Sequence, residues 1–440
     1  MSGARGLPRR LLQLADQQRR WLLSRNFWPR LIAPVRNAPV AAVTGLVVTG
    51  LVLLAVAERV RIAWRRLRRA RPRLIWGPSS ILNIKYWSLA MREQGYRSQT
   101  CVDAPAVITK RDDFDRYRDE FLGGGSLSER FRSHAMFAWA LRNGDVFLRY
   151  FDGGFLRSTP LEWWECRLMR LAGKRIVVSP YGGDIAVPEY LGEMREATLA
   201  DYPELPKQAP LTRRRVLHAL RWADVSVRNY QIGFQPSYDV VWPTQLGVDT
   251  QLWSSDGGFT DADGRSGQVT VLHAPNHRAI KGTSHLERAV EELCAEGLRI
   301  DLRILERRPN EEIRSAMPAV DVVADQFLDP GYGLFSLEAM ASGKPVLCRM
   351  SPIPAELQAD SLRACPILDT DPSRLKANLR RVIENPSLRR ELGKAGRRYV
   401  ESYHSPEAIG RDWGAIIQHA WRGAPLPERL LPPQPAASES

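Results

Sequence analysis

The sequence contains few cysteines and no long low-complexity tract. Its five cysteines are odd in number, scattered along 440 residues, and never stand in a C-x-x-C spacing. This pattern argues against a disulfide framework and a cysteine zinc site, and a reducing cytosol is the expected setting. The chain is also too long for one ordinary core, so we expect two globular domains with additional segments.

Acidic residues are nearly absent from the first 73 positions. Sixteen arginines stand there against Asp16 and Glu58, whereas the rest of the chain holds 47 basic and 47 acidic side chains. The net charge of +14 therefore comes from one end of the sequence. A neutral body does not match the footprint of a phosphate-backbone binder, so we expect no nucleic acid partner.

Uncharged apolar runs are short, except for APVAAVTGLVVTGLVLLAVA at 38–57. As a helix, twenty residues rise about 30 Å, the thickness of a hydrocarbon core. We predict a transmembrane helix there, between a basic amphipathic leader at 1–37 and a basic juxtamembrane segment at 58–73. A buried core helix and a signal peptide are the alternatives. Core helices rarely stay uncharged for so long between arginine clusters, and the leader is too long for a signal peptide.

The arginines flanking this run suggest an orientation. Eight arginines lie between Arg59 and Arg73, against five between Arg19 and Arg36. Positive-inside counting thus favours a cytosolic body at the cell inner membrane, with a single-pass or monotopic anchor. The leader itself suits an anionic leaflet, and if it stays cytosolic, the apolar run must be re-entrant or paired.

From residue 74 onward, apolar runs alternate with helical patterns, which predicts parallel α/β layers. A polar, proline-containing stretch at 188–212 looks like a surface excursion. The expected parts are a first Rossmann-like domain at 74–255, a second Rossmann-like domain at 268–404, a helix at 405–423 packing back on the first domain, and a disordered tail at 424–440.

Glycine turns end three strands of the first predicted domain. They contain Gly77, the pair Gly153 and Gly154, and Gly183 in the sequence YGGD. In open α/β sheets, ligands bind at the edge formed by the carboxyl ends of the strands. We therefore expect these glycine turns to line a cleft.

The second domain carries the more specific signals. HAPNHRAIKGT places Arg278 and Lys281 in a short loop where both cations can converge on a diphosphate, although a solvated loop with surface charges gives the same pattern. DQFLDPGYGLFSLEAMASGKPVL, at 325–347, then reads as a strand end, a glycine turn and a helix whose free amides favour an anion. Glu338 is a lone carboxylate in this apolar helix and is placed to accept hydrogen bonds from sugar hydroxyls; the alternative is an exposed helix glutamate.

HRAIKGT and GYGLFSLEAMASGKPV resemble the donor-sugar domain of the retaining glycosyltransferases of family 4. The resemblance continues in GKRIVVSPYGGDI and VVWPTQLGVDTQLW and covers about 74–422. It implies the GT-B fold, with an acceptor domain at 74–255 and a donor domain at 268–404 facing across a cleft, and transfer from a nucleoside diphosphate sugar with retention. The residues implied on the acceptor side are Gly77, Gly153, Gly154, Tyr181 and Gly183. By this resemblance Arg278 and Lys281 hold the donor diphosphate, and Glu338 holds the ribose.

The resemblance also implies that no metal or other cofactor is needed. The backbone amides of Gly333, Leu334 and Phe335 would stabilise the negative charge of the leaving group, together with the two cations Arg278 and Lys281. The absence of a convincing Asp-x-Asp motif agrees with this.

Two positions depart from the family pattern. Tyr181 replaces the histidine of a histidine-glycine-x-aspartate turn, while Asp184 matches its aspartate and is expected to have a catalytic role. Pro330 stands where the first of two glutamates is usual, eight residues before Glu338. Either Asp325 or Asp329 supplies the missing carboxylate, or the sugar is held differently, or activity is lost.

The leading hypothesis is a membrane-anchored glycosyltransferase whose partners are a nucleotide sugar, membrane lipids and a lipid-linked or saccharide acceptor; a soluble acceptor is also compatible. The alternative is a catalytically silent GT-B scaffold in a membrane polysaccharide or glycolipid assembly complex. A third hypothesis, a sugar-nucleotide epimerase, fits the fold, but a membrane anchor does not suit its soluble substrates.

Overall fold

The computed structural model describes residues 38–106, 109–254, 258–354, 357 and 359–432. The chain divides into two compact units, Met1–Leu54 and Ala55–Ser440. The leader predicted at 1–37 lies outside the described residues. In the first unit the described residues, 38–54, form the beginning of helix α3 (Ala38–Leu67).

Helix α3 is longer than the predicted transmembrane helix. Its stretch Val43–Leu67 is long and apolar enough to cross a bilayer by length and composition. The helix continues past residue 57 because no glycine or proline follows until it stops at Leu67, just before Arg69 adopts a φ of 51°. Most of the basic segment predicted at 58–73 is thus the second half of the same helix.

Within the second unit, this half of α3 packs on the first domain. Glu58 is buried and accepts a hydrogen bond from Lys174 Nζ at 2.8 Å, and Arg65 pairs with Asp145 at 3.0 Å. Ile62, 2% exposed, joins the core of the first sheet. Residues 58–67 therefore belong to the folded body, and the expectation of a separate juxtamembrane segment is corrected.

The first sheet has seven parallel strands in the order β3-β2-β1-β4-β5-β6-β7. Leu74 of β1 is in register with Val146 of β4, and the apolar side chains of both strands are buried. The strands are β1 (Leu74–Trp76), β2 (Ser98–Val102), β3 (Arg116–Tyr117), β4 (Val146–Arg149), β5 (Arg175–Val178), β6 (Val225–Arg228) and β7 (Val240–Val241). The helices between them are α4 (Asn83–Glu93), α5 (Ser126–Asn143), α6 (Glu165–Leu171), α7 (Arg195–Asp201) and α8 (Leu205–Trp222).

The second sheet has five parallel strands in the order β12-β11-β10-β8-β9. Its strands are β8 (Val269–His273), β9 (Ile300–Ile304), β10 (Val322–Ala324), β11 (Val346–Cys348) and β12 (Leu368–Asp369). Its helices are α9 (Arg278–Lys281), α10 (Thr283–Ala295), α11 (Asn310–Ala316), α12 (Leu334–Ala341), α13 (Asp360–Arg363), α14 (Leu375–Ile383) and α15 (Pro386–Tyr403). The alternation of apolar runs and helices thus gives two parallel α/β layers, as predicted.

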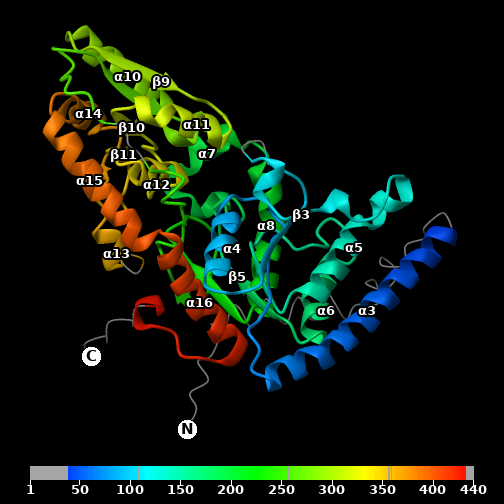
Figure 1. The fold of residues 1–440 in the computed structure, drawn as a ribbon. Coiled ribbons are helices and arrows are strands. Elements are labelled where there is room, and N and C mark those ends of the chain that lie inside the picture. Colours follow the sequence, from blue (N-terminus) through cyan, green and yellow to red (C-terminus); the bar gives the residue numbers. More distant parts are fainter. Residues whose placement is uncertain (1–37, 107–108, 255–257, 355–356, 358, 433–440) are drawn as a thin grey trace, which may run out of the picture. The chain divides into compact units, whose positions relative to one another are not determined.

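The last helix, α16 (Pro406–Arg422), lies beside α4 of the first domain (Figure 1). Its Trp413 packs 5.0 Å from the ring of Trp87 in the core. The tail predicted to be disordered is partly ordered, because Leu430 is buried in the same core and Arg429 pairs with Asp412. Residues 433–440 lie outside the described part of the chain.

Candidate active site

A cavity of about 600 Å³ lies at the carboxyl ends of strands from both sheets. Parallel strands of an α/β sheet present their ligand sites at this edge. One wall comes from the turn after β5, from α7 and from the beginning of α8; the other comes from the turns after β8 and β10. The polar and glycine residues that line it are Tyr181, Gly182, Gly183, Thr198, Asp201, Tyr202, Glu204, Gln208, Gln231, His277, Lys281, Gln326 and Asp329.

Lys281 is the cation that the cavity receives from the second domain. It ends α9, where Gly282 at φ +71° turns the chain into α10. Its ammonium pairs with Asp325 and donates to Gln326 Oε1 at 2.7 Å. The side chain is 16% exposed, so a ligand in the cavity can reach it.

Asp325 lies behind Lys281 and is fully buried. Its second oxygen accepts a hydrogen bond from Ser336 of α12 at 2.5 Å. Burial raises the pKa of Asp325, but the charge of Lys281 and the bonds from Lys281 and Ser336 outweigh it, so the pKa is below the ordinary value. The carboxylate is therefore charged and committed to the ion pair.

Asp329, the other candidate for the missing carboxylate, lines the cavity itself. Burial raises its pKa to about 6, although Lys281 acts in the opposite direction. Gln326 donates to its backbone carbonyl at 3.1 Å, which holds the turn before Pro330. Of the two aspartates, Asp329 is the one placed to contact a ligand.

The structure does not bring Arg278 into this cavity. Its guanidinium pairs with Glu287 at 2.6 Å and with Glu306 at 3.5 Å, and its side chain is 41% exposed. The cause is local, since one carboxylate on α10 and one after β9 flank the arginine. Convergence of Arg278 and Lys281 on a diphosphate remains a prediction that requires Arg278 to leave these partners.

The glycine turn after β10 begins α12. Gly333 precedes the helix, which Leu334 and Phe335 open, and Tyr332 between the glycines is buried. The hydroxyl of Tyr332 lies 2.8 Å from the hydroxyl of Tyr399 and 3.0 Å from His404 Nε2. The turn is therefore held from inside the domain before any ligand binds.

Glu338 is 3% exposed, so the alternative of an exposed helix glutamate is excluded. Asn310, on α11, donates to Glu338 Oε1 at 2.6 Å. Burial raises the pKa of Glu338 to about 8, against the effect of the Asn310 hydrogen bond. The lone carboxylate has a partner within the chain, and its contact with a ribose stays a prediction.

Asp184 fixes the YGGD turn. It accepts hydrogen bonds from the backbone amides of Phe151 at 2.9 Å and of Tyr181 and Gly182 at 3.0 Å. Burial and nearby Asp152 raise its pKa to about 7, while these backbone bonds act in the opposite direction. Asp184 does not line the cavity, whereas Tyr181 and Gly183 of the same turn do.

Three of the expected acceptor-side glycines lie outside the cavity lining. A Cβ atom on Gly77 would stand 2.0 Å from the carbonyl oxygen of Cys101, and one on Gly154 would stand 2.0 Å from Glu165 Oε1. Gly153 has a φ of +116°, which disfavours other residues. These glycines allow close packing at strand ends.

The wall formed by α7 was not expected, because 188–212 reads as a surface excursion. Tyr202 follows α7, and its hydroxyl lies 2.6 Å from Nε2 of His277. Asp201 accepts from the backbone amide of Ile280 at 2.9 Å. These hydrogen bonds join the segment 188–212 to the turn that carries Lys281. No local pattern in the sequence indicates either pairing.

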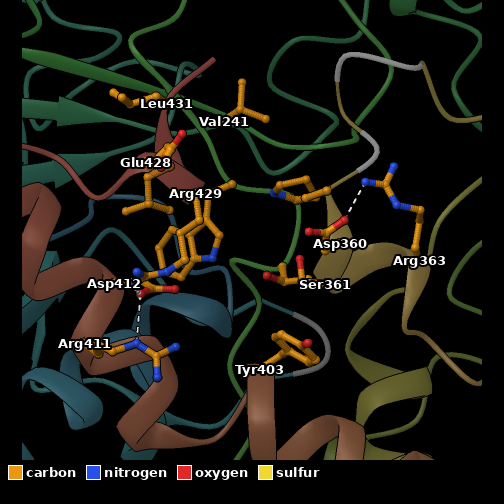
Figure 2. A pocket seen from close by; sticks show the side chains of 15 residues that line it. Val241, Asp360, Ser361, Arg363, Tyr403, Arg411, Asp412, Glu428, Arg429 and Leu431 are labelled. Atoms are coloured by element: carbon orange, nitrogen blue, oxygen red, sulfur yellow. Dashed lines mark hydrogen bonds and ion pairs between the residues drawn. The ribbon is translucent and has the colours of Figure 1, made fainter. Parts of the chain in front are cut away.

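A second cavity, of about 460 Å³, lies between residues 428–431 and α13 (Figure 2). Its cations are paired with its own carboxylates: Arg411 and Arg429 with Asp412, and Arg363 with Asp360. In the part of the chain that the structure describes, no group of three or more histidine, cysteine, aspartate or glutamate side chains is arranged to hold a metal ion.

Comparison with known proteins gives a family match over part of the chain and a fold. Residues 271–399 match the model of the family described as glycosyl transferases group 1. The chain is 25% identical over 233 residues to the MMP α-(1→4)-mannosyltransferase of Mycolicibacterium hassiacum, covering 47% of this chain and 55% of that protein. It is 36% identical over 80 residues to the D-inositol 3-phosphate glycosyltransferase of Corynebacterium urealyticum, covering 18% of each. The aligned segments thus span about half, or less, of these relatives.

Among solved structures, the chain is similar to Anabaena HepE in complex with UDP-glucose. The TM-score is 0.50 at 15% identity, covering 79% of this chain and all of that one. The predicted fold class is thereby confirmed, with two parallel-sheet α/β domains that match GT-B glycosyltransferases.

Proposed function

We propose that this protein is a membrane-anchored glycosyltransferase that moves a sugar from a nucleoside diphosphate sugar to a lipid-linked or saccharide acceptor with retention. The observation that carries the proposal is Lys281, a largely buried cation at a cavity between two Rossmann-like domains, inside the segment that matches the family model. The relatives are sugar transferases, and HepE binds UDP-glucose, which supports a nucleotide sugar as donor.

In this proposal Lys281 neutralises charge that develops on the leaving diphosphate, and a metal ion is not required. The amides at the beginning of α12, with Leu334 and Phe335 in its first turn, add partial positive charge at the same end of the sheet. Asp329 is placed to accept hydrogen bonds from hydroxyls of the transferred sugar, the role expected of the glutamate that Pro330 replaces.

Glu338 is proposed to bind the nucleotide ribose. For this it must share or exchange its hydrogen bond from Asn310, because that amide already occupies Oε1. Donor binding and the position of Asn310 on α11 are therefore expected to be coupled.

We propose that Asp184 contributes to catalysis indirectly, by fixing the conformation of the YGGD turn at 181–184. Three backbone amides bind its carboxylate, and the turn presents Tyr181 and Gly183 to the cavity. The acceptor is proposed to enter from this side, past α7. The apolar part of α3, which continues into the first domain, supports delivery of that acceptor by a membrane.

One observation favours the alternative of a catalytically silent scaffold. Lys281 and Glu338 both have partners within the chain, so the site is internally satisfied. Calorimetry of the full-length protein with uridine, guanosine and cytidine diphosphate sugars separates the two functions. Binding of one donor followed by transfer to a membrane acceptor supports the enzyme, and a folded protein that binds none of them supports the scaffold.

A further inference from the structure

The second half of α3 carries an exposed apolar stripe on the folded body. Val56, Val60, Trp64 and Leu67 are 49%, 70%, 53% and 81% exposed. Their spacing of four, four and three residues places them on one face of the helix, within about 80° of arc. An exposed stripe of this kind is unusual on a water-facing surface and marks an interaction site.

The opposite face of the same segment is fixed to the first domain. Ala55 and Ile62 are buried, and Glu58 bonds to Lys174, whose side chain is completely buried. Arg66 donates to the carbonyl oxygen of Gly173 at 3.2 Å. The segment cannot be surrounded by lipid on all sides while these contacts exist, so residues 55–67 do not form part of a bilayer crossing.

Arginines border the stripe on both edges. At 100° per residue, Arg61 and Arg68 fall on one edge and Arg59 on the other. Arg59 and Arg68 are exposed, the Arg61 side chain is 44% exposed, and Arg68 stacks 3.5 Å above the ring of Trp64. Cations and an indole beside an apolar stripe suit the boundary between lipid headgroups and acyl chains.

We infer that this face is a docking surface for an anionic phospholipid leaflet, which Val56, Val60, Trp64 and Leu67 enter shallowly while the bordering arginines meet the headgroup phosphates. Charge complementarity and the continuity of the segment with the apolar part of α3 identify the occupant. Because the inner face is bonded to the first domain, the docked helix sets how the body is oriented on the membrane. The inference rests on the membrane association proposed above and not on sugar transfer.

The test uses the full chain with Val60→Cys and Cys294→Ser, labelled with an environment-sensitive fluorophore. The remaining cysteines are buried or partly buried, and Cys294, exposed on α10, carries the control label in the unmodified protein. In vesicles of phosphatidylcholine and phosphatidylglycerol, a lipid-phase quencher should reach the label at position 60 and not the label at Cys294. Replacing Arg59 or Arg61 by glutamine should weaken docking about fivefold each, whereas Arg288→Gln on α10 should not.

The other outcomes overturn the inference. A label at position 60 that stays open to an aqueous quencher, in protein that floats with the vesicles, shows that the face is not docked. Shielding from both quenchers shows that protein, such as a second copy, covers the face. A chain that does not float at all also refutes the membrane association in the proposed function, while donor binding remains a separate measurement.

Discussion

Lys281 and Asp325 form an ion pair at the wall of the cavity, with the carboxylate fully buried behind the ammonium. Asp325 also accepts from Ser336, so the pair joins α9 to α12. A donor phosphate would therefore meet a positive charge that is positioned before binding. Preorganisation of this kind lowers the free energy lost on ordering the site.

Replacing Lys281 by alanine is expected to weaken donor affinity at least tenfold. A charge-assisted hydrogen bond contributes about 1.5 to 3 kcal/mol, and the buried Asp325 would then repel the phosphates. Calorimetric titration with the donor that binds the unmodified protein measures the change. Lys376→Ala is the matched control, because Lys376 pairs with Glu292 and Glu296 and does not line the cavity. Unchanged affinity in a folded Lys281→Ala variant would refute the assignment.

Arg278 gives a second test, because two carboxylates compete for it. If Arg278 reaches the diphosphate, Arg278→Ala should weaken donor affinity at least tenfold. Glu287→Gln, which removes the partner at 2.6 Å, should then strengthen it. Both variants are measured by the same titration. If neither variant changes the donor affinity, Arg278 lies outside the donor site, as it does in the structure.

Glu338 predicts a dependence of stability on pH. Its pKa is raised to about 8 in the folded chain from an ordinary value of 4.5, so the folded state binds more protons between these values. The free energy of unfolding contributed by this group therefore falls as pH rises from about 4.5 to about 8. Glu338→Gln, which can still accept from Asn310, should be stabilising at pH 8 and much less so at pH 5.

Thermal unfolding at both pH values measures this difference. Glu287→Gln, at a half-exposed position, is the control and should show no such trend. The same Glu338→Gln variant should lose donor affinity above about pH 8, where a neutral amide replaces the charged carboxylate proposed to accept from the ribose hydroxyls. A stability difference between Glu338→Gln and the unmodified protein that is equal at pH 5 and pH 8 would contradict the raised pKa.

The sequence predicted the parts of this protein that depend on local pattern. Strands β8, β10 and β11 and the glycine turn before α12 lie where apolar runs and glycines indicate them. Contacts between distant segments were not predictable. Glu306, which draws Arg278 away, is 28 residues from it, and Asp201 meets Ile280 across 79 residues. A single sequence, taken alone, contains no signal that pairs such positions.

Helix α3 is also held by a contact between distant segments that the sequence does not indicate, and a last prediction follows from that contact. Its arginines and apolar run indicate a membrane, but Glu58 pairs with Lys174, 116 residues away, where both are buried. Burial lowers the pKa of Lys174 to about 8, although Glu58 opposes this. Lys174→Ala would leave Glu58 buried without this cation, and the expected loss is about 3 to 5 kcal/mol of unfolding free energy.

Denaturant unfolding of the full chain in detergent micelles measures this loss. Adding Glu58→Gln to Lys174→Ala should recover part of it, because the buried carboxylate that has lost its buried cation is then replaced by a neutral amide. Arg61→Gln is the control, since Arg61 bonds to Glu58 from a 44% exposed position and should change stability by less than about 1 kcal/mol. If Lys174→Ala behaves like this control, residues 58–67 are not fixed to the body, and the membrane docking surface loses its support.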